Sequence, residues 1–119
     1  MIINKLKKWK DKKGRKPLLI TGVRQCGKTY ILKEFGKNEF EDMVYLNFDG
    51  DTALQSIFDY DYDVNRIMHE IEEIIIGRKI SICETLVIFD EIQACDRAVA
   101  SLKYFYENLP ELHLIAAGS

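Results

Sequence analysis

Residues 22–29 read GVRQCGKT: a glycine, four residues, and then Gly-Lys-Thr. This spacing is typical of the phosphate-binding P-loop, in which glycines let the backbone approach a polyphosphate closely. In such a loop, Lys28 reaches the β- and γ-phosphates and Thr29 offers its hydroxyl to Mg²⁺. The residues that we therefore expect around the phosphates are Gly22, Val23, Arg24, Gln25, Cys26, Gly27, Lys28, Thr29 and Tyr30.

The flanking sequence supports this interpretation, because a P-loop follows a strand and opens a helix. Residues 17–21, PLLIT, form a short apolar run typical of a buried parallel strand. Residues 29–35 then place apolar side chains at helical spacing, and Gly36 is the expected end of that helix.

Further along the chain, apolar runs alternate with helical patterns. Asp63 is a predicted N-cap for a helix that Gly77 ends, and Asp96 is a predicted cap for a helix ended by Pro110. Between residues 49 and 63 an acidic, aromatic stretch shows no clear period. The predicted strands cover residues 43–48, 85–90 and 112–117. In the helix that Pro110 ends, the residues expected to face inward are Val99, Leu102, Tyr106 and Leu109. Such alternation predicts an α/β fold with a parallel sheet covered on both faces.

An acidic pair follows the most apolar predicted strand, in the sequence LVIFDE. An acid at the tip of a hydrophobic strand is the Walker B arrangement, in which Asp90 would hold Mg²⁺ alongside Thr29. Glu91 would then be the general base that orients and deprotonates an attacking water. Because ligands bind beyond the carboxyl ends of parallel strands, the P-loop, Asp90 and Ser119 are expected around one crevice.

Four stretches together resemble one family: RKPLLITGVRQCGKTYILKEFG, VYLNFDGD, LVIFDEIQ and LKYFYENLPELHLIAAGS. The chain is similar to the prokaryotic AAA-type ATPases whose longer members continue into a C-terminal domain of unknown function. The resemblance implies the additional-strand catalytic glutamate class of three-layer P-loop NTPase fold, with strand order 1-4-3-2. It also implies a polar sensor near the γ-phosphate at Ser119, ATP and Mg²⁺ as cofactors, and catalytic roles for Glu91 and Lys28.

The chain departs from that family at its C-terminus. It stops after the fourth predicted strand, so the fold is expected to be truncated before a fifth strand, without the helical lid or an arginine finger. Arg24 is the one arginine in the loop, and we expect it to point to solvent or to a neighbour. An open edge on the first strand follows from the same expectation.

The first 16 residues differ in charge from the rest of the chain. They hold eight Lys or Arg and one acid, which is +7, so the net charge of -2 leaves -9 for residues 17–119. Ile2, Ile3, Leu6 and Trp9 lie at helical spacing within this segment. It is therefore expected as a basic amphipathic helix, residues 1–16, docked on a nucleotide-binding core, residues 17–119. A solvated lysine face is one interpretation, and contact with nucleic acid is the other.

Length and composition are those of one globular domain: 119 residues, 47% hydrophobic and 30% charged. No apolar run approaches the roughly 18 residues of a membrane span, and no apolar core of a signal peptide follows the basic N-terminus. Three widely spaced cysteines match neither a zinc site nor a disulfide framework. We therefore expect a cytoplasmic protein with no membrane association.

The motifs leave two classes of function for this chain. A GTPase would need the DxxG and NKxD motifs, which are lacking, and a small-molecule kinase has no need of the water-activating Glu91. The remaining hypotheses are an ATPase domain and a nucleotide-binding switch that hydrolyses ATP slowly or not at all. A homo-oligomer or a partner protein is compatible with either, and the target of the domain is not encoded in these residues.

Overall fold

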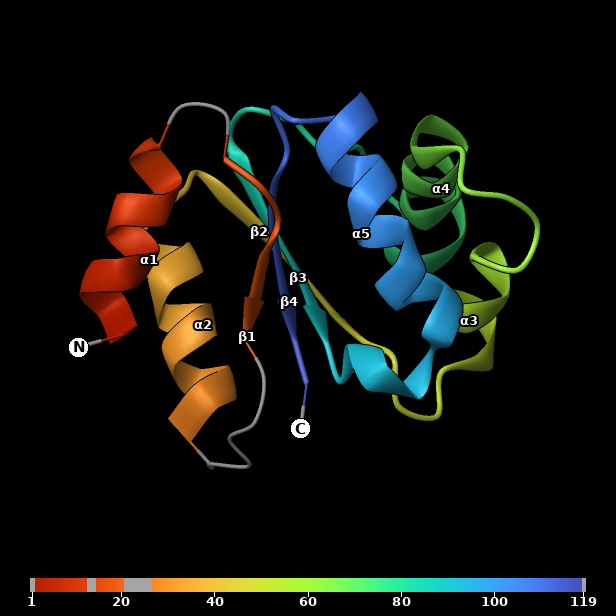
Figure 1. Ribbon diagram of the computed structural model, residues 1–119, viewed down its shortest axis with the longest axis horizontal. Coiled ribbons are helices and arrows are strands. Elements are labelled where there is room, and N and C mark those ends of the chain that lie inside the picture. The colour runs from red at the N-terminus through yellow and green to blue at the C-terminus, as the bar shows by residue number, and fades with distance from the viewer. Residues whose placement is uncertain (1, 13–14, 21–26, 119) are drawn as a thin grey trace.

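The computed structural model describes residues 2–12, 15–20 and 27–118. A central sheet separates two layers of helices, as Figure 1 shows, with the N-terminal helices on one side and the later ones on the other. The fold is therefore the predicted three-layer α/β arrangement. The helices are α1 (Ile2–Asp11), α2 (Gly27–Glu39), α3 (Thr52–Ile57), α4 (Val64–Glu70) and α5 (Asp96–Asn108), and the strands are β1 (Leu18–Ile20), β2 (Asp42–Asn47), β3 (Thr85–Asp90) and β4 (His113–Ala117).

The four strands are all parallel and lie in the order β1-β4-β3-β2. The predicted order 1-4-3-2 is thus confirmed. Their carboxyl ends share one edge of the sheet, where Asn47 of β2 lies opposite Asp90 of β3. At the same edge, the amide of Gly118 donates to the carbonyl of Ile20 over 3.0 Å. A residue directly after a strand therefore lies at this carboxyl end of the sheet.

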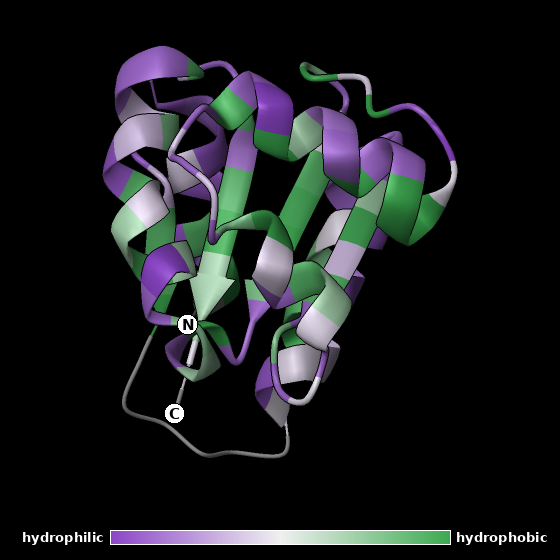
Figure 2. Cartoon of the chain, turned by 90° about the vertical axis from the view of Figure 1, so that its right-hand side faces the viewer, coloured by the Kyte–Doolittle hydropathy of each residue, from purple (hydrophilic) through white to green (hydrophobic). Residues whose placement is uncertain are grey.

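Both faces of the sheet are covered, and every residue of β3 is buried. On the side of α3, α4 and α5, four phenylalanine rings meet edge to face at the centre of the core. On the side of α1 and α2 a smaller cluster fills the space beneath the helices. Figure 2 shows the apolar strands behind the mixed surface of the helices. The four rings belong to Phe48, Phe58, Phe89 and Phe105.

Helix α1 packs through an apolar face. Leu6 is fully buried, and the Trp9 indole N–H donates to the carbonyl of Lys16 over 2.7 Å. Lys5, Lys7 and Lys8 lie exposed on its other side. Among the described residues, no helix is long and apolar enough to cross a membrane.

Helix α2 continues past its expected end. Gly36 lies inside the helix and is buried, so the prediction that it ends the helix is wrong. A Cβ at this position would lie 2.5 Å from Sδ of Met43 and 3.2 Å from Leu86. The glycine thus fits the close approach of α2 to the sheet and does not mark a change of backbone direction.

The stretch without a clear period contains a helix that sequence reasoning missed. Asp51 caps α3 by accepting a hydrogen bond from the amide of Leu54. The predicted Asp63 cap is confirmed, because its carboxylate accepts from the amides of Asn65 and Arg66 at the start of α4. A π-helix over Ile71–Ile76 follows α4, and Gly77 ends it in the left-handed conformation.

Helix α5 presents a different face from the predicted one. Its buried residues are Ala98, Ser101 and Phe105, whereas Val99 and Tyr106 are exposed. The inward prediction for those two was wrong by one position, because a small alanine and a serine whose hydroxyl bonds the Ala98 carbonyl fit against the sheet. The helix begins at Asp96, with Cys95 rather than Asp96 at the cap position.

Candidate functional site

A buried carboxylate lies at the carboxyl edge of the sheet. Asp90, the last residue of β3, is only 1% exposed. Its Oδ2 accepts a hydrogen bond from the Thr29 hydroxyl over 2.9 Å, and Lys28 Nζ lies 3.7 Å from its Oδ1. The Lys28 side chain is itself only 8% exposed. The fold thus brings together the three side chains for which the sequence predicts phosphate and metal chemistry.

The first turn of α2 supplies a second element of this site. The helix begins at Gly27, so the amides of its first four residues have no acceptor within the helix. These amides and the positive end of the helix dipole form a favourable place for an anion. The helix is 13 residues long and carries no acid in its first turn. Tyr30 also lies in this turn and is 67% exposed.

Tyr45 of β2 is an additional member of the cluster that sequence reasoning missed. Its phenol donates to Asp90 Oδ2 over 2.5 Å. Burial, together with the hydrogen bond to Asp90 and the charge of that carboxylate, raises the pKa of Tyr45 to about 12. The phenol is therefore protonated near neutral pH and acts as the donor. No sequence signal gives the register of β2 against β3, which pairs Tyr45 with Ile88 and so brings it near Asp90.

Glu91 follows Asp90 in an uncommon backbone conformation. With φ 51° and ψ 44° it lies in the left-handed region, the single non-glycine residue to do so in the described part of the chain. Its amide donates to Asp90 Oδ1 over 2.9 Å, and its Oε1 accepts from Gln93 Nε2 over 2.7 Å. A non-glycine residue in this region costs on the order of 1–3 kcal/mol and is concentrated at functional sites.

Gln93 and Gly118 also belong to this edge and were not assigned a role from the sequence. A Cβ on Gly118 would lie 2.5 Å from Oε1 of Gln93. The absence of a side chain at the end of β4 therefore leaves room for the amide that bonds Glu91. The remaining predicted site residues, Gly22, Val23, Arg24, Gln25, Cys26 and Ser119, lie outside the described residues.

The family model of the AAA domain matches residues 14–119. The chain belongs to the AAA domain family. Its fold, with a parallel sheet ordered 1-4-3-2, is consistent with the N-terminal part of an AAA-type P-loop ATPase. The family supports a nucleotide-binding, ATPase-like function for the domain. The comparison with curated proteins returned no match.

The oxygen atoms at the edge of this AAA domain fit a hard divalent cation. Mg²⁺ prefers one or two carboxylates together with substrate phosphates, rather than a cage made wholly by protein. Asp90 and Thr29 provide a carboxylate and a hydroxyl 2.9 Å apart. Within residues 2–12, 15–20 and 27–118, no three His, Cys, Asp or Glu side chains gather as a metal site of their own. The donor set therefore fits Mg²⁺ that arrives with a nucleotide.

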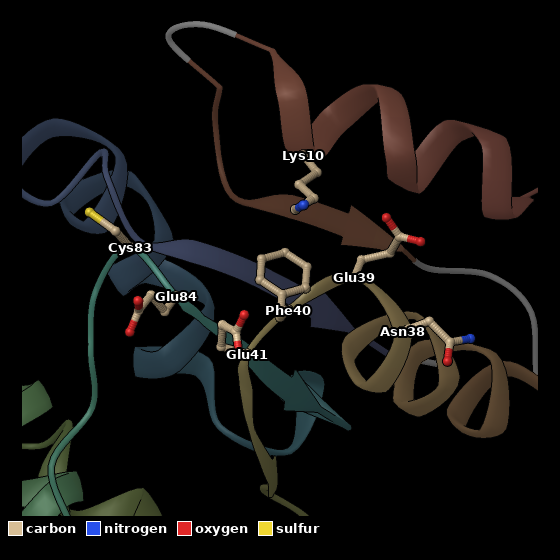
Figure 3. Close-up of a pocket in the computed structure, with 7 residues that line it drawn as sticks. All are labelled: Lys10, Asn38, Glu39, Phe40, Glu41, Cys83 and Glu84. Carbon is tan, nitrogen blue, oxygen red and sulfur yellow. The ribbon is translucent and has the colours of Figure 1, made fainter.

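The amino ends of the strands, at the opposite end of the sheet, hold a different set of polar groups. Figure 3 shows an open pocket there, with Lys10 of α1 extending toward the ring of Phe40. Next to it, the Arg15 guanidinium lies 3.1 Å from Nδ1 of His113, so Nδ1 must accept and the ring is protonated on Nε2. Burial and the nearby Arg15 charge lower the pKa of His113 to about 4. This histidine is therefore neutral at physiological pH, and its contacts with Arg15 and Trp9 are structural.

Proposed function

We propose that this AAA domain binds ATP together with Mg²⁺ and hydrolyses it. The observation that carries the proposal is the buried cluster in which Asp90 contacts Thr29 and Lys28, which lie about 60 positions earlier in the chain. Buried charges are costly unless paired, and ionisable groups gathered at the end of a strand are typical of functional sites. Membership of the AAA domain family supports a nucleotide as the ligand.

Each residue has a role that follows from its chemistry. Lys28 would leave Asp90 and neutralise charge on the β- and γ-phosphates, while the amides of the loop and of the first α2 turn would donate hydrogen bonds to the phosphate oxygens. Gly22, Val23, Arg24, Gln25, Cys26, Gly27 and Tyr30 would contribute to that cradle through their backbone. Thr29 and Asp90 would hold Mg²⁺, which when bound neutralises charge that develops on the phosphates.

Glu91 and Ser119 would act on the far side of the γ-phosphate. A carboxylate directly after the end of β3 would orient a water and take its proton. Gln93 holds one Glu91 oxygen, which limits the rotation of that carboxylate. Ser119 follows β4, the strand between β1 and β3, and would contact the γ-phosphate from there.

A switch that binds ATP with little turnover is the second candidate, and one observation favours it. Fast phosphoryl transfer commonly uses an arginine finger, worth about 10³–10⁵ in rate. The arginines of the described residues are engaged elsewhere: Arg15 with His113, Arg66 with Asp61 and Glu70, Arg78 with Asp42, and Arg97 with the Phe58 carbonyl. We therefore expect slow hydrolysis by this chain alone.

Phosphate release from Mg·ATP by wild type and Glu91→Gln separates the two candidates. If Glu91 is the general base, the substitution lowers the rate by roughly 10²–10⁴-fold while ATP still binds. Glu107→Gln, at an exposed position on α5, is the matched control and should leave the rate unchanged. Equal rates for wild type and Glu91→Gln would exclude Glu91 as the general base and favour the nucleotide-binding switch.

A further inference from the structure

Tyr45 reaches Asp90 from the neighbouring strand. In the register of the sheet, Tyr45 is paired with Ile88, and Asp90 lies two residues further along β3 on the same face. The phenol spans this offset and donates to Oδ2 over 2.5 Å. The contact therefore depends on strand pairing, and not on the position of the P-loop.

The donors to the Asp90 carboxylate form two pairs. Oδ1 accepts from the Glu91 amide over 2.9 Å and faces Lys28 Nζ at 3.7 Å. Oδ2 accepts from Thr29 over 2.9 Å and from Tyr45. Each oxygen thus has one partner in the first turn of α2 and one partner in the sheet or directly after it.

Nucleotide binding changes only half of these contacts. Under the proposed function, Lys28 turns to the phosphates, and the Thr29 oxygen gives a lone pair to the metal while its hydroxyl proton can still face Oδ2. The Glu91 amide then remains on Oδ1 and the Tyr45 phenol remains on Oδ2. Among the described side chains, Tyr45 is the donor to Asp90 that has no other task in the bound state.

The tyrosine ring is held by contacts of its own. Lys33 of α2 places Nζ 4.2 Å from the centre of the ring, a favourable cation–π arrangement. The ring is also partly buried against the cluster beneath α1 and α2. Its orientation is therefore set by α2 and the sheet before any ligand arrives.

We propose that Tyr45 is a positioning residue for the metal site, which keeps the Asp90 carboxylate oriented toward the bound cation after Lys28 has turned away and the Thr29 oxygen has been engaged by the metal. The inference rests on the proposed function. Without the phenol, Oδ2 of a carboxylate that is 1% exposed keeps only the Thr29 hydroxyl, which the metal also engages, and the carboxylate can rotate. Groups that orient a metal ligand in this way typically contribute 10–100-fold in metal affinity.

The test is the affinity for a fluorescent ATP analogue, measured in Mg²⁺ and again in EDTA. The dissociation constant in EDTA divided by that in Mg²⁺ reports how much the metal contributes to binding, without any turnover. We expect Tyr45→Phe to lower this ratio by roughly tenfold, with the affinity in EDTA unchanged. Tyr60→Phe removes the same hydroxyl from a ring that is 81% exposed and should match wild type in both buffers.

Three outcomes are distinguishable. A ratio for Tyr45→Phe equal to that of wild type would overturn the positioning role and leave nucleotide binding standing. Equal losses in Mg²⁺ and in EDTA would mean that Tyr45 supports the fold only, which also overturns the proposal. A wild-type protein that binds the analogue in neither buffer would overturn the proposed function, and the inference with it.

Discussion

At the amino end of the sheet, polar side chains join helices and loops to the strands, whereas at the carboxyl end they contact mainly one another. Trp9 bonds the Lys16 carbonyl just before β1, and Arg15 bonds both the Glu111 carbonyl and His113. At the other end, Lys28, Thr29 and Tyr45 all converge on Asp90. The first set of contacts connects parts of the fold, and the second concentrates charge at one point.

This difference separates residues kept for stability from residues kept for binding. A structural polar contact should cost stability when it is removed. Replacing a buried ion pair that serves a ligand as a whole, both partners together, should cost little stability and should remove the response to the ligand.

The largest effect is expected at the amino end, for Trp9→Ala. Trp9 is 8% exposed, packs edge to face on His113, and fixes α1 to the start of β1. We expect the free energy of unfolding to fall by about 3–5 kcal/mol in urea denaturation. Trp9→Phe, which keeps a ring and loses the indole N–H, should cost clearly less. A loss below about 1 kcal/mol for Trp9→Ala would mean that α1 is not a structural helix.

The second prediction concerns the carboxyl end. The double variant Lys28→Met, Asp90→Asn replaces a buried ion pair with neutral side chains, which is often neutral or stabilising. We expect an unfolding free energy equal to or above that of wild type without ligand, and loss of roughly 2.7 kcal/mol of stabilisation by saturating Mg·ATP. Urea denaturation with and without ligand measures both. Marked destabilisation without ligand would place this cluster with the structural contacts.

The third prediction is a pH dependence that comes from the amino end. The pKa of His113 is about 4 in the folded chain against about 6.5 when unfolded, so the unfolded chain binds more protons between these values. The free energy of unfolding should therefore fall as the pH is lowered from 6.5 toward 4.

His113→Gln should flatten that slope in urea denaturation at a series of pH values. His69→Gln is the control, because His69 is exposed on α4 and its side chain lies 3.9 Å from that of Glu73. An unchanged slope in His113→Gln would show that the ring is already protonated or solvated in the fold.

The smallest effect is expected for Arg78→Gln. Its guanidinium bonds both oxygens of Asp42 at the start of β2, but the two side chains are 46% and 35% exposed. Solvent screening limits such a pair to at most about 1 kcal/mol. The hydrogen bond from Arg78 also lowers the pKa of Asp42, so NMR titration should find that pKa higher in the variant. A loss above 2 kcal/mol would show that an exposed pair can dominate this edge.

The alternation of strands and helices, and the meeting of Asp90 with Thr29, could be predicted because both follow from local patterns and parallel topology. The strand order came from the family resemblance. Tyr45 was missed because hydrophobic runs do not specify which residues of two parallel strands are paired. Gly36 was misread because its close approach to Met43 is a tertiary contact, and tertiary contacts override the usual helix-ending role of glycine.

Helix α5 shows the same limit on the other face of the sheet. Val99 and Tyr106 have the larger apolar side chains, so the pattern predicted them inward, yet Ala98 and Ser101 lie against the sheet. How closely a helix approaches its sheet determines which size of side chain faces inward, and that distance is not visible in one sequence. The loop between β1 and α2 remains a prediction from its motif.

The most direct test of the central claim is thermal melting of the chain with and without saturating Mg·ATP, beside Lys28→Ala. Ligand at 100 times its dissociation constant stabilises the folded state by about 2.7 kcal/mol. For a domain of this size we expect a rise in Tm of about 10 °C in wild type, and none in the variant. A cooperative melt that Mg·ATP does not shift, or an equal shift in Lys28→Ala, would contradict a nucleotide site at the carboxyl edge of the sheet.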